Sequence, residues 1–131
     1  MRTFWLTHDI EAPANVLWDL LTDTDQWPLW GPSVRSATVD DGRRLSADSK
    51  GTVSTALGIT LPFAITDWAD GARWAWTVAG IPATTHSVEA LSPTRSRVGL
   101  GVPAAAAPYL MVCRVALRRL DRTAVARRSA A

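Results

Sequence analysis

Apolar and polar residues alternate along residues 3–10, the pattern of a β-strand with one buried face. From Pro13 onwards the apolar residues recur at helical spacing, so residues 13–22 are predicted to form a short helix with proline in its first turn. A second helical turn is expected to follow through Trp27 and to end at Pro28. The chain is therefore expected to open with a strand and two short helices.

Turn-forming residues divide the next part of the chain, up to about residue 102, into short segments. Asp70-Gly71 is a strong hairpin signal, and residues 79–83 are predicted to form another turn. The segments between the turns predict six antiparallel strands, at residues 34–39, 52–57, 59–68, 72–78, 84–91 and 95–102.

The last part of the chain, from Pro103 to Arg127, is predicted to be one long amphipathic helix with an apolar arc and an arginine-rich face. After an antiparallel sheet, such a helix buries its apolar arc best across the concave face of that sheet. The sequence thus predicts an α+β fold in which a curved sheet wraps around a long C-terminal helix. One domain is expected over residues 1–127, followed by a frayed tail at 128–131. A curved sheet around a helix leaves a wedge-shaped gap, and such gaps hold ligands.

Composition adds one observation that bears on such a gap: seven of the 131 residues are tryptophan. Tryptophan is favoured where apolar surface meets water or a ligand, because its indole N–H needs a partner when it is buried. The excess is consistent with an aromatic-lined cavity and equally with an ordinary core of large side chains.

Positive charge is concentrated at the C-terminal end. Residues 1–103 carry eight Lys/Arg and eleven Asp/Glu, whereas residues 104–131 carry six Arg and the single acid Asp121. This arginine face is interpreted as a solvated helix surface, the alternative being contact with anionic lipid headgroups or nucleic acid. No nucleic-acid partner and no stable membrane insertion are expected, and the chain start lacks the apolar segment of a secretory signal, which favours the cytoplasm.

Several stretches resemble the SRPBCC superfamily, in particular its polyketide cyclase/dehydrase-like branch. They are Ile10-Glu11-Ala12-Pro13, residues 16–23, Trp27-Pro28-Leu29-Trp30, Pro62-Phe63, residues 65–68, Arg73-Trp74-Ala75-Trp76 and Ala107-Pro108-Tyr109-Leu110. The resemblance implies the helix-grip (START-like) fold and a pocket for a hydrophobic molecule. The sequence departs from the family at residues 97–101, where two glycines indicate either a bulge with extra cavity room or a cramped crossing beneath the helix.

His86 is the first candidate for chemistry. Pairing of residues 72–78 with 84–91 across the turn at 79–83 would place it beside Trp76 on the apolar face. A neutral imidazole there could donate or accept a proton. The alternative is a core histidine that is hydrogen-bonded to a backbone carbonyl.

Tyr109 and Asp67 are the other catalytic candidates. Tyr109 begins the long helix on its buried arc, where its hydroxyl could orient a ligand carbonyl or simply reach solvent. Asp67 is expected to share a strand face with Phe63 and Ile65, as a buried acid paired with a ligand or with His86. The alternative for Asp67 is a solvated residue near the Asp70-Gly71 turn.

The expected function is binding of a small hydrophobic or aromatic, polyketide-like molecule. If the protein is an enzyme, cofactor-independent cyclisation, aldol condensation or dehydration is expected, the alternative being a non-enzymatic lipid or quinone carrier or sensor. Ligand contacts are expected from Trp74, Trp76, Phe63, Trp30, Trp27, Val88 and Cys113. No metal or nucleotide cofactor is expected, since two histidines and one cysteine give no known ligand spacing and no phosphate-binding loop is present. The oligomeric state, monomer or dimer, stays open.

Overall fold

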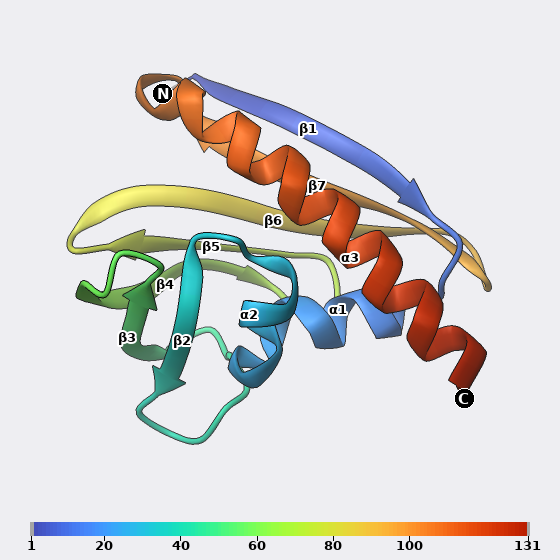
Figure 1. Ribbon diagram of the computed structural model, residues 1–131, viewed down its shortest axis with the longest axis horizontal. Coiled ribbons are helices and arrows are strands. Elements are labelled where there is room, and N and C mark those ends of the chain that lie inside the picture. The colour runs from blue at the N-terminus through green and yellow to red at the C-terminus, as the bar shows by residue number, and fades with distance from the viewer. Residues whose placement is uncertain (1, 131) are drawn as a thin grey trace.

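One curved antiparallel sheet forms the body of the protein in the computed structural model, which describes residues 2–130 (Figure 1). Its seven strands lie in the order β1-β7-β6-β5-β4-β3-β2. The strands are β1 (Thr3–Ile10), β2 (Val34–Val39), β3 (Lys50–Thr55), β4 (Thr60–Ala69), β5 (Arg73–Val78), β6 (Ile81–Ser92) and β7 (Arg95–Pro103). The helices are α1 (Ala14–Thr22), α2 (Trp27–Trp30) and α3 (Leu110–Ala130), with 3-10 turns η1 (Thr24–Gln26) and η2 (Ala104–Tyr109).

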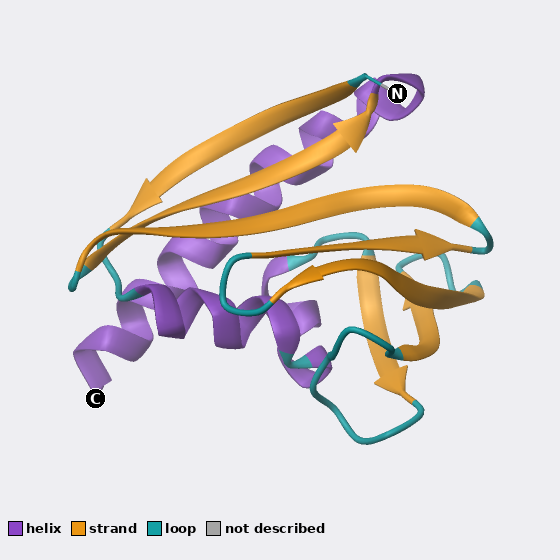
Figure 2. Ribbon diagram, turned by 180° about the vertical axis from the view of Figure 1, so that it is seen from behind, coloured by secondary structure: helices purple, strands orange, loops and turns teal. Residues whose placement is uncertain are grey.

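Helix α3 crosses one face of the sheet, and α1 and α2 lie on that same face (Figures 1 and 2). The apolar arc of α3 is buried there, at Cys113, Ala116, Leu117, Leu120 and Ala124. The predicted α+β helix-grip fold is confirmed. None of the helices in the described part of the chain has the length and apolarity needed to cross a bilayer.

Two tryptophans lock α2 to the end of α1. The indole N–H of Trp27 donates to the carbonyl of Leu21 at 2.9 Å, and that of Trp30 donates to the carbonyl of Leu20 at 2.8 Å. Carbonyls in the last turn of a helix have no partner within the helix. These two bonds therefore satisfy both the helix carbonyls and the indole N–H groups. The two short helices are thereby held to each other.

Three predicted helix boundaries need correction. Pro28 lies inside α2 rather than ending it, because proline is tolerated in the first turn, where its missing N–H would have no partner. The C-terminal α-helix begins at Leu110 and not at Pro103, since η2 is kinked at Ala106 (φ −107°, ψ 23°) and contains Pro108. Helix α3 also continues to Ala130 into the expected tail, of which Ala131 lies outside the described residues.

The predicted pairing of β5 with β6 was wrong by two residues. Ala79 and Gly80 both have positive φ (52° and 77°), which makes a two-residue hairpin turn, so β6 starts at Ile81. A bulge then sets Trp76 opposite two residues of β6, between the pairs Ala75–Thr85 and Thr77–Pro82. As a result His86 pairs with Trp74 and not with Trp76.

The two glycines of β7 serve neither of the purposes that the sequence indicated. A Cβ on Gly101 would lie 2.9 Å from Cε2 of Trp5, and a Cβ on Gly99 would lie 2.5 Å from Oγ of Ser87 and 3.4 Å from the Trp5 indole. Trp5, on β1, is 46% exposed. On the face of the sheet turned away from α3, Gly101 therefore makes room for Trp5, and Gly99 makes room for Ser87.

Candidate functional site

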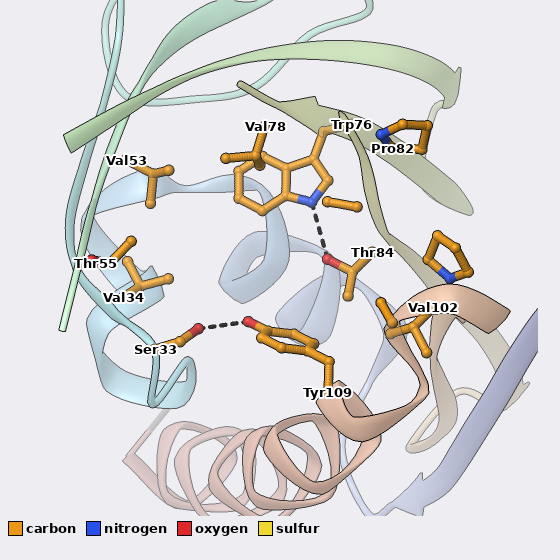
Figure 3. A pocket seen from close by; sticks show the side chains of 13 residues that line it. Ser33, Val34, Val53, Thr55, Trp76, Val78, Pro82, Thr84, Val102 and Tyr109 are labelled. Atoms are coloured by element: carbon orange, nitrogen blue, oxygen red, sulfur yellow. Dashed lines mark hydrogen bonds between the residues drawn. The ribbon is translucent and has the colours of Figure 1, made fainter. Parts of the chain in front are cut away.

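A cavity of about 290 Å³ opens between the sheet and the start of α3 (Figure 3). In Figure 3, Trp76 and Val78 lie on one side of it, and Ser33 and Tyr109 lie on the opposite side. We call it the outer cavity; it is lined by Ser33, Val34, Val53, Thr55, Trp76, Val78, Pro82, Ala83, Thr84, Val102, Pro103, Ala106 and Tyr109. Most of these side chains are apolar, which suits an apolar ligand.

Four of the polar side chains of the outer cavity are hydrogen-bonded to one another, and the hydroxyl of the fifth, Thr55, accepts from the backbone N–H of Ile59 at 3.3 Å. The hydroxyls of Ser33 and Tyr109 are 2.6 Å apart and join the segment before β2 to the end of η2. On the other side, the indole N–H of Trp76 donates to the hydroxyl of Thr84 at 3.0 Å (Figure 3). Burial raises the pKa of the Tyr109 phenol, which therefore stays protonated at neutral pH.

A second, smaller cavity of about 40 Å³ adjoins the first. The two share the lining residues Ser33, Val34, Trp76, Thr84 and Tyr109. We call the smaller one the inner cavity; its further lining comes from Trp27, Trp30, Gly31, Pro32, Trp74, His86, Leu100, Val112, Cys113 and Ala116. It has room for one or a few water-sized groups, because a water occupies roughly 10–15 Å³ on this scale.

His86 lies on the inner cavity and is 3% exposed. Its Nδ1 is 3.4 Å from the carbonyl oxygen of Trp74, and its Nε2 is 3.3 Å from the hydroxyl of Thr84. A carbonyl oxygen only accepts, so Nδ1 carries the proton and Nε2 accepts from Thr84. This tautomer also leaves the Thr84 oxygen free to accept from Trp76, so that the three side chains form one consistent chain of donors and acceptors.

Burial lowers the pKa of His86 from 6.5 to about 3, against a weaker opposing effect of the bond to the Trp74 carbonyl. The imidazole is therefore neutral at pH 7. Burial likewise raises the pKa of the Cys113 thiol to about 11. His86 and Cys113, like Tyr109, are thus uncharged in the inner cavity at neutral pH.

Asp67 is not brought to either cavity. It is half exposed and paired with Arg73, whose Nε donates to its Oδ2 at 2.7 Å, and this pairing lowers the pKa of the carboxyl. A bulge in β4 between Ile65 and Asp67 breaks the alternation, so Asp67 leaves the face of Phe63 and Trp68 takes the inward position opposite Trp74. The prediction that Asp67 shares a strand face with Phe63 and Ile65 was therefore wrong.

The other expected site residues divide among three environments. Trp76 and Tyr109 line both cavities, and His86, Trp27, Trp30, Trp74 and Cys113 line the inner cavity. Phe63 and Val88 line neither and are buried in the core, where Phe63 packs on Trp27 and Trp76 with ring centroids 5.8 and 5.3 Å apart.

Most of the residues that line the outer cavity were not predicted from the sequence. Its walls include Ser33, Val53, Thr84, Val102 and Ala106, which come from five separate segments. One signal was available: Thr84 is a hydroxyl residue on the apolar face of a strand, two residues before His86, where a buried hydroxyl requires a partner. Within residues 2–130, no three His, Cys, Asp or Glu side chains gather as metal ligands would.

Comparison with known proteins shows the family of the chain. The family model described as "Polyketide cyclase / dehydrase and lipid transport" matches residues 1–126. The chain belongs to this family. The resemblance to the SRPBCC superfamily is thus confirmed, and a hydrophobic-ligand-binding fold is what members of this family share.

Solved structures of family-like fold are similar over nearly the whole chain. The protein XoxI from Bacillus cereus has a TM-score of 0.74 and 15% identity, with 95% of this chain and 96% of that chain covered. A protein from Nitrosomonas europaea has a TM-score of 0.71 and 16% identity, with 98% and 97% covered. The di-domain ARO/CYC BexL from the BE-7585A biosynthetic pathway has a TM-score of 0.73 and 14% identity, with 93% of this chain but 46% of that chain covered. These similarities show the fold, and no curated protein matches the chain.

Proposed function

We propose that this member of the polyketide cyclase/dehydrase and lipid transport family binds one small, mainly apolar molecule in the outer cavity and holds it unchanged. The observation that carries the proposal is the cavity of about 290 Å³ between the sheet and the start of α3, with its mainly apolar lining. Its volume lies near the lower end of the range of small-molecule sites, roughly 300–1,000 Å³, so the ligand is compact.

The hydrogen bonds around the outer cavity support binding without chemistry. Tyr109 is paired with Ser33, and Thr84 is paired with both Trp76 and His86. Polar groups that are already satisfied by the protein shape a pocket but offer no unpaired acid or base to a substrate. The neutral His86, whose pKa is about 3, is a poor proton acceptor at pH 7.

The test combines native mass spectrometry with a blocked cavity. The purified protein is expected to carry or to take up a compact apolar compound, which denaturing extraction then identifies. Ala106 lines the outer cavity, whereas its neighbour Ala105 is exposed and does not. Ala106→Trp is expected to weaken binding by about tenfold or more, equal to about 1.4 kcal/mol, while Ala105→Trp leaves it nearly unchanged. Equal affinity in the two variants would contradict binding at this site.

A second candidate function is cofactor-independent cyclisation, aldol condensation or dehydration of a polyketide-like substrate. The hydroxyl of Tyr109, held by Ser33 at the edge of the outer cavity, is the observation in its favour. In this proposal Tyr109, which is hydrogen-bonded to Ser33, is the proton donor. Tyr109→Phe would then abolish turnover of such a substrate while binding is retained. Absence of turnover by the unaltered protein would leave binding alone as the function.

A further inference from the structure

The indole N–H of Trp74 has no hydrogen-bond partner, alone among the buried side-chain nitrogen and oxygen atoms of the described chain. Trp74 is fully buried, and its ring stacks with those of Trp27 (centroids 5.7 Å apart) and His86 (3.7 Å). An unpaired buried donor costs about 1–3 kcal/mol, so its presence requires an explanation. The indoles of Trp27, Trp30 and Trp76, in contrast, all donate to protein oxygens.

Trp74 lines the inner cavity, and its Nε1 exposes less than 1 Å². An acceptor that enters the inner cavity therefore reaches this donor only by displacing the side chains packed around it. At about 40 Å³ this space is too small for a ring but large enough for a carbonyl group. It adjoins the outer cavity along Trp76, Thr84 and Tyr109, which line both. A ligand whose ring system fills the outer cavity can therefore extend one small group inward.

The charges around the inner cavity limit the chemistry of that group. Its titratable residues are His86, Cys113 and Tyr109. All three are neutral at pH 7, since burial lowers the pKa of His86 and raises the pKa of Cys113 and of Tyr109 further above 7. No Lys, Arg, Asp or Glu lines either cavity. A carboxylate placed here would lose its hydration without gaining a cation, which is costly. An ammonium group would meet the unpaired donor of Trp74 and gain nothing from it.

We propose that the inner cavity is a subsite for an uncharged acceptor oxygen, a ketone or quinone carbonyl, which accepts a hydrogen bond from Nε1 of Trp74. This inference rests on the proposed function, because the ring system attached to that carbonyl occupies the outer cavity. The protein then selects neutral aromatic carbonyl compounds over carboxylates of the same shape and over hydrocarbons that lack the oxygen.

Three probes of nearly equal shape test the subsite by isothermal titration calorimetry at pH 7.5. They are 2-acetylnaphthalene (neutral carbonyl), 2-naphthoate (anion) and 2-ethylnaphthalene (no acceptor). The ketone is expected to bind about tenfold more tightly than either of the others. Compared with 2-ethylnaphthalene it gains a buried hydrogen bond, which contributes on the order of 1 kcal/mol, whereas the carboxylate of 2-naphthoate loses its hydration without meeting a cation.

The donor itself is tested with Trp74→Phe, which keeps a ring in the stack but removes the N–H. The preference for the ketone over 2-ethylnaphthalene is expected to fall from about tenfold to about twofold or less. The matched control is Trp68→Phe, since Trp68 lines neither cavity. The preference of this variant for the ketone over 2-ethylnaphthalene is expected to equal that of the unaltered protein. Should Trp74→Phe fail to fold, indole ¹⁵N–¹H spectra of the unaltered protein serve instead: the ketone shifts the Trp74 signal downfield and 2-ethylnaphthalene does not.

The outcomes distinguish failure of the subsite alone from failure of the proposed function. Equal affinities for the three probes, as a structural water alone in the inner cavity would give, overturn the subsite but leave ligand binding intact. Binding of 2-naphthoate as tight as that of the ketone also overturns the subsite. The carboxylate would then either occupy the inner cavity or point out of the outer cavity into solvent. Failure of the unaltered protein to bind any of the three overturns the proposed function and the subsite together.

Discussion

The imidazole of His86 lies nearly parallel to the indole of Trp74, with ring centroids 3.7 Å apart and 15° between the planes. The two residues are paired across β5 and β6, and both are almost fully buried. Burial in this stack explains why His86 stays neutral: an imidazolium would lose its hydration there, and this outweighs the bond to the Trp74 carbonyl, which favours the charged form.

The pKa of His86 predicts a loss of stability in mild acid. Below pH 6.5 the unfolded chain takes up a proton on this residue, whereas the folded protein does so only near its lowered pKa of about 3. The stability that the neutral ring contributes is therefore complete above pH 6.5 and declines as the pH falls from 6.5 towards 3. Between pH 7 and pH 5 the loss from this group is about 2 kcal/mol. Urea unfolding at both pH values measures it.

His86→Gln is the comparison for this measurement, because glutamine is polar but does not titrate. The variant is expected to lose about 2 kcal/mol less than the unaltered protein between pH 7 and pH 5, whatever its stability at pH 7. Parallel losses in the two proteins would show that His86 does not carry the pH dependence.

Thr84→Val should destabilise the protein although it preserves shape. Trp76 and His86 would both lose the hydroxyl that they share, leaving a buried N–H and a buried ring nitrogen unpaired. The expected cost is about 1–3 kcal/mol of unfolding free energy. Thr85→Val is the matched control, since Thr85 points to the other face of β6, and it is expected to cost little. A similar small cost for both variants would mean that the Thr84 bonds are weak.

Two glycines predict contrasting tolerance of an added methyl group. A Cβ on Gly51 would lie 1.9 Å from the backbone oxygen of Thr38 and could not be accommodated without moving β2. A Cβ on Gly101 would meet mainly the Trp5 indole, which is 46% exposed and free to tilt. Gly51→Ala is expected to cost about 3 kcal/mol or more and Gly101→Ala about 1 kcal/mol, as read from urea midpoints. The reverse order would contradict this packing.

Cys113 should react slowly with thiol reagents in the folded protein. Its thiol is buried, and burial raises its pKa from 9.0 to about 11. At pH 8 this alone reduces the thiolate, the reacting form, about 100-fold. Ellman's reagent is expected to modify the folded protein at least about 100-fold more slowly than the urea-unfolded chain. Comparable rates would show that the inner cavity is open to the reagent.

The alternation and spacing of apolar residues determined most of the architecture. The order of strands and helices, the long C-terminal amphipathic helix and its place across the sheet all follow from local periodicity, which each segment carries in its own residues. The tryptophans around the inner cavity and His86 beside them were expected for the same reason, because residues on the apolar face of one strand stay together whatever their partners are.

Only the tertiary structure decided the register and the cavities. Single-residue bulges in β4 and β6 turned Asp67 outward and set His86 on Trp74, and nothing in the local pattern marks where a bulge falls. The outer cavity joins Ser33, Thr84 and Tyr109 from three distant segments, and the unpaired N–H of Trp74 is defined only by everything that packs around it. Local periodicity fixes which face of a segment is apolar, but an empty space and an unmet hydrogen bond are properties of many segments together.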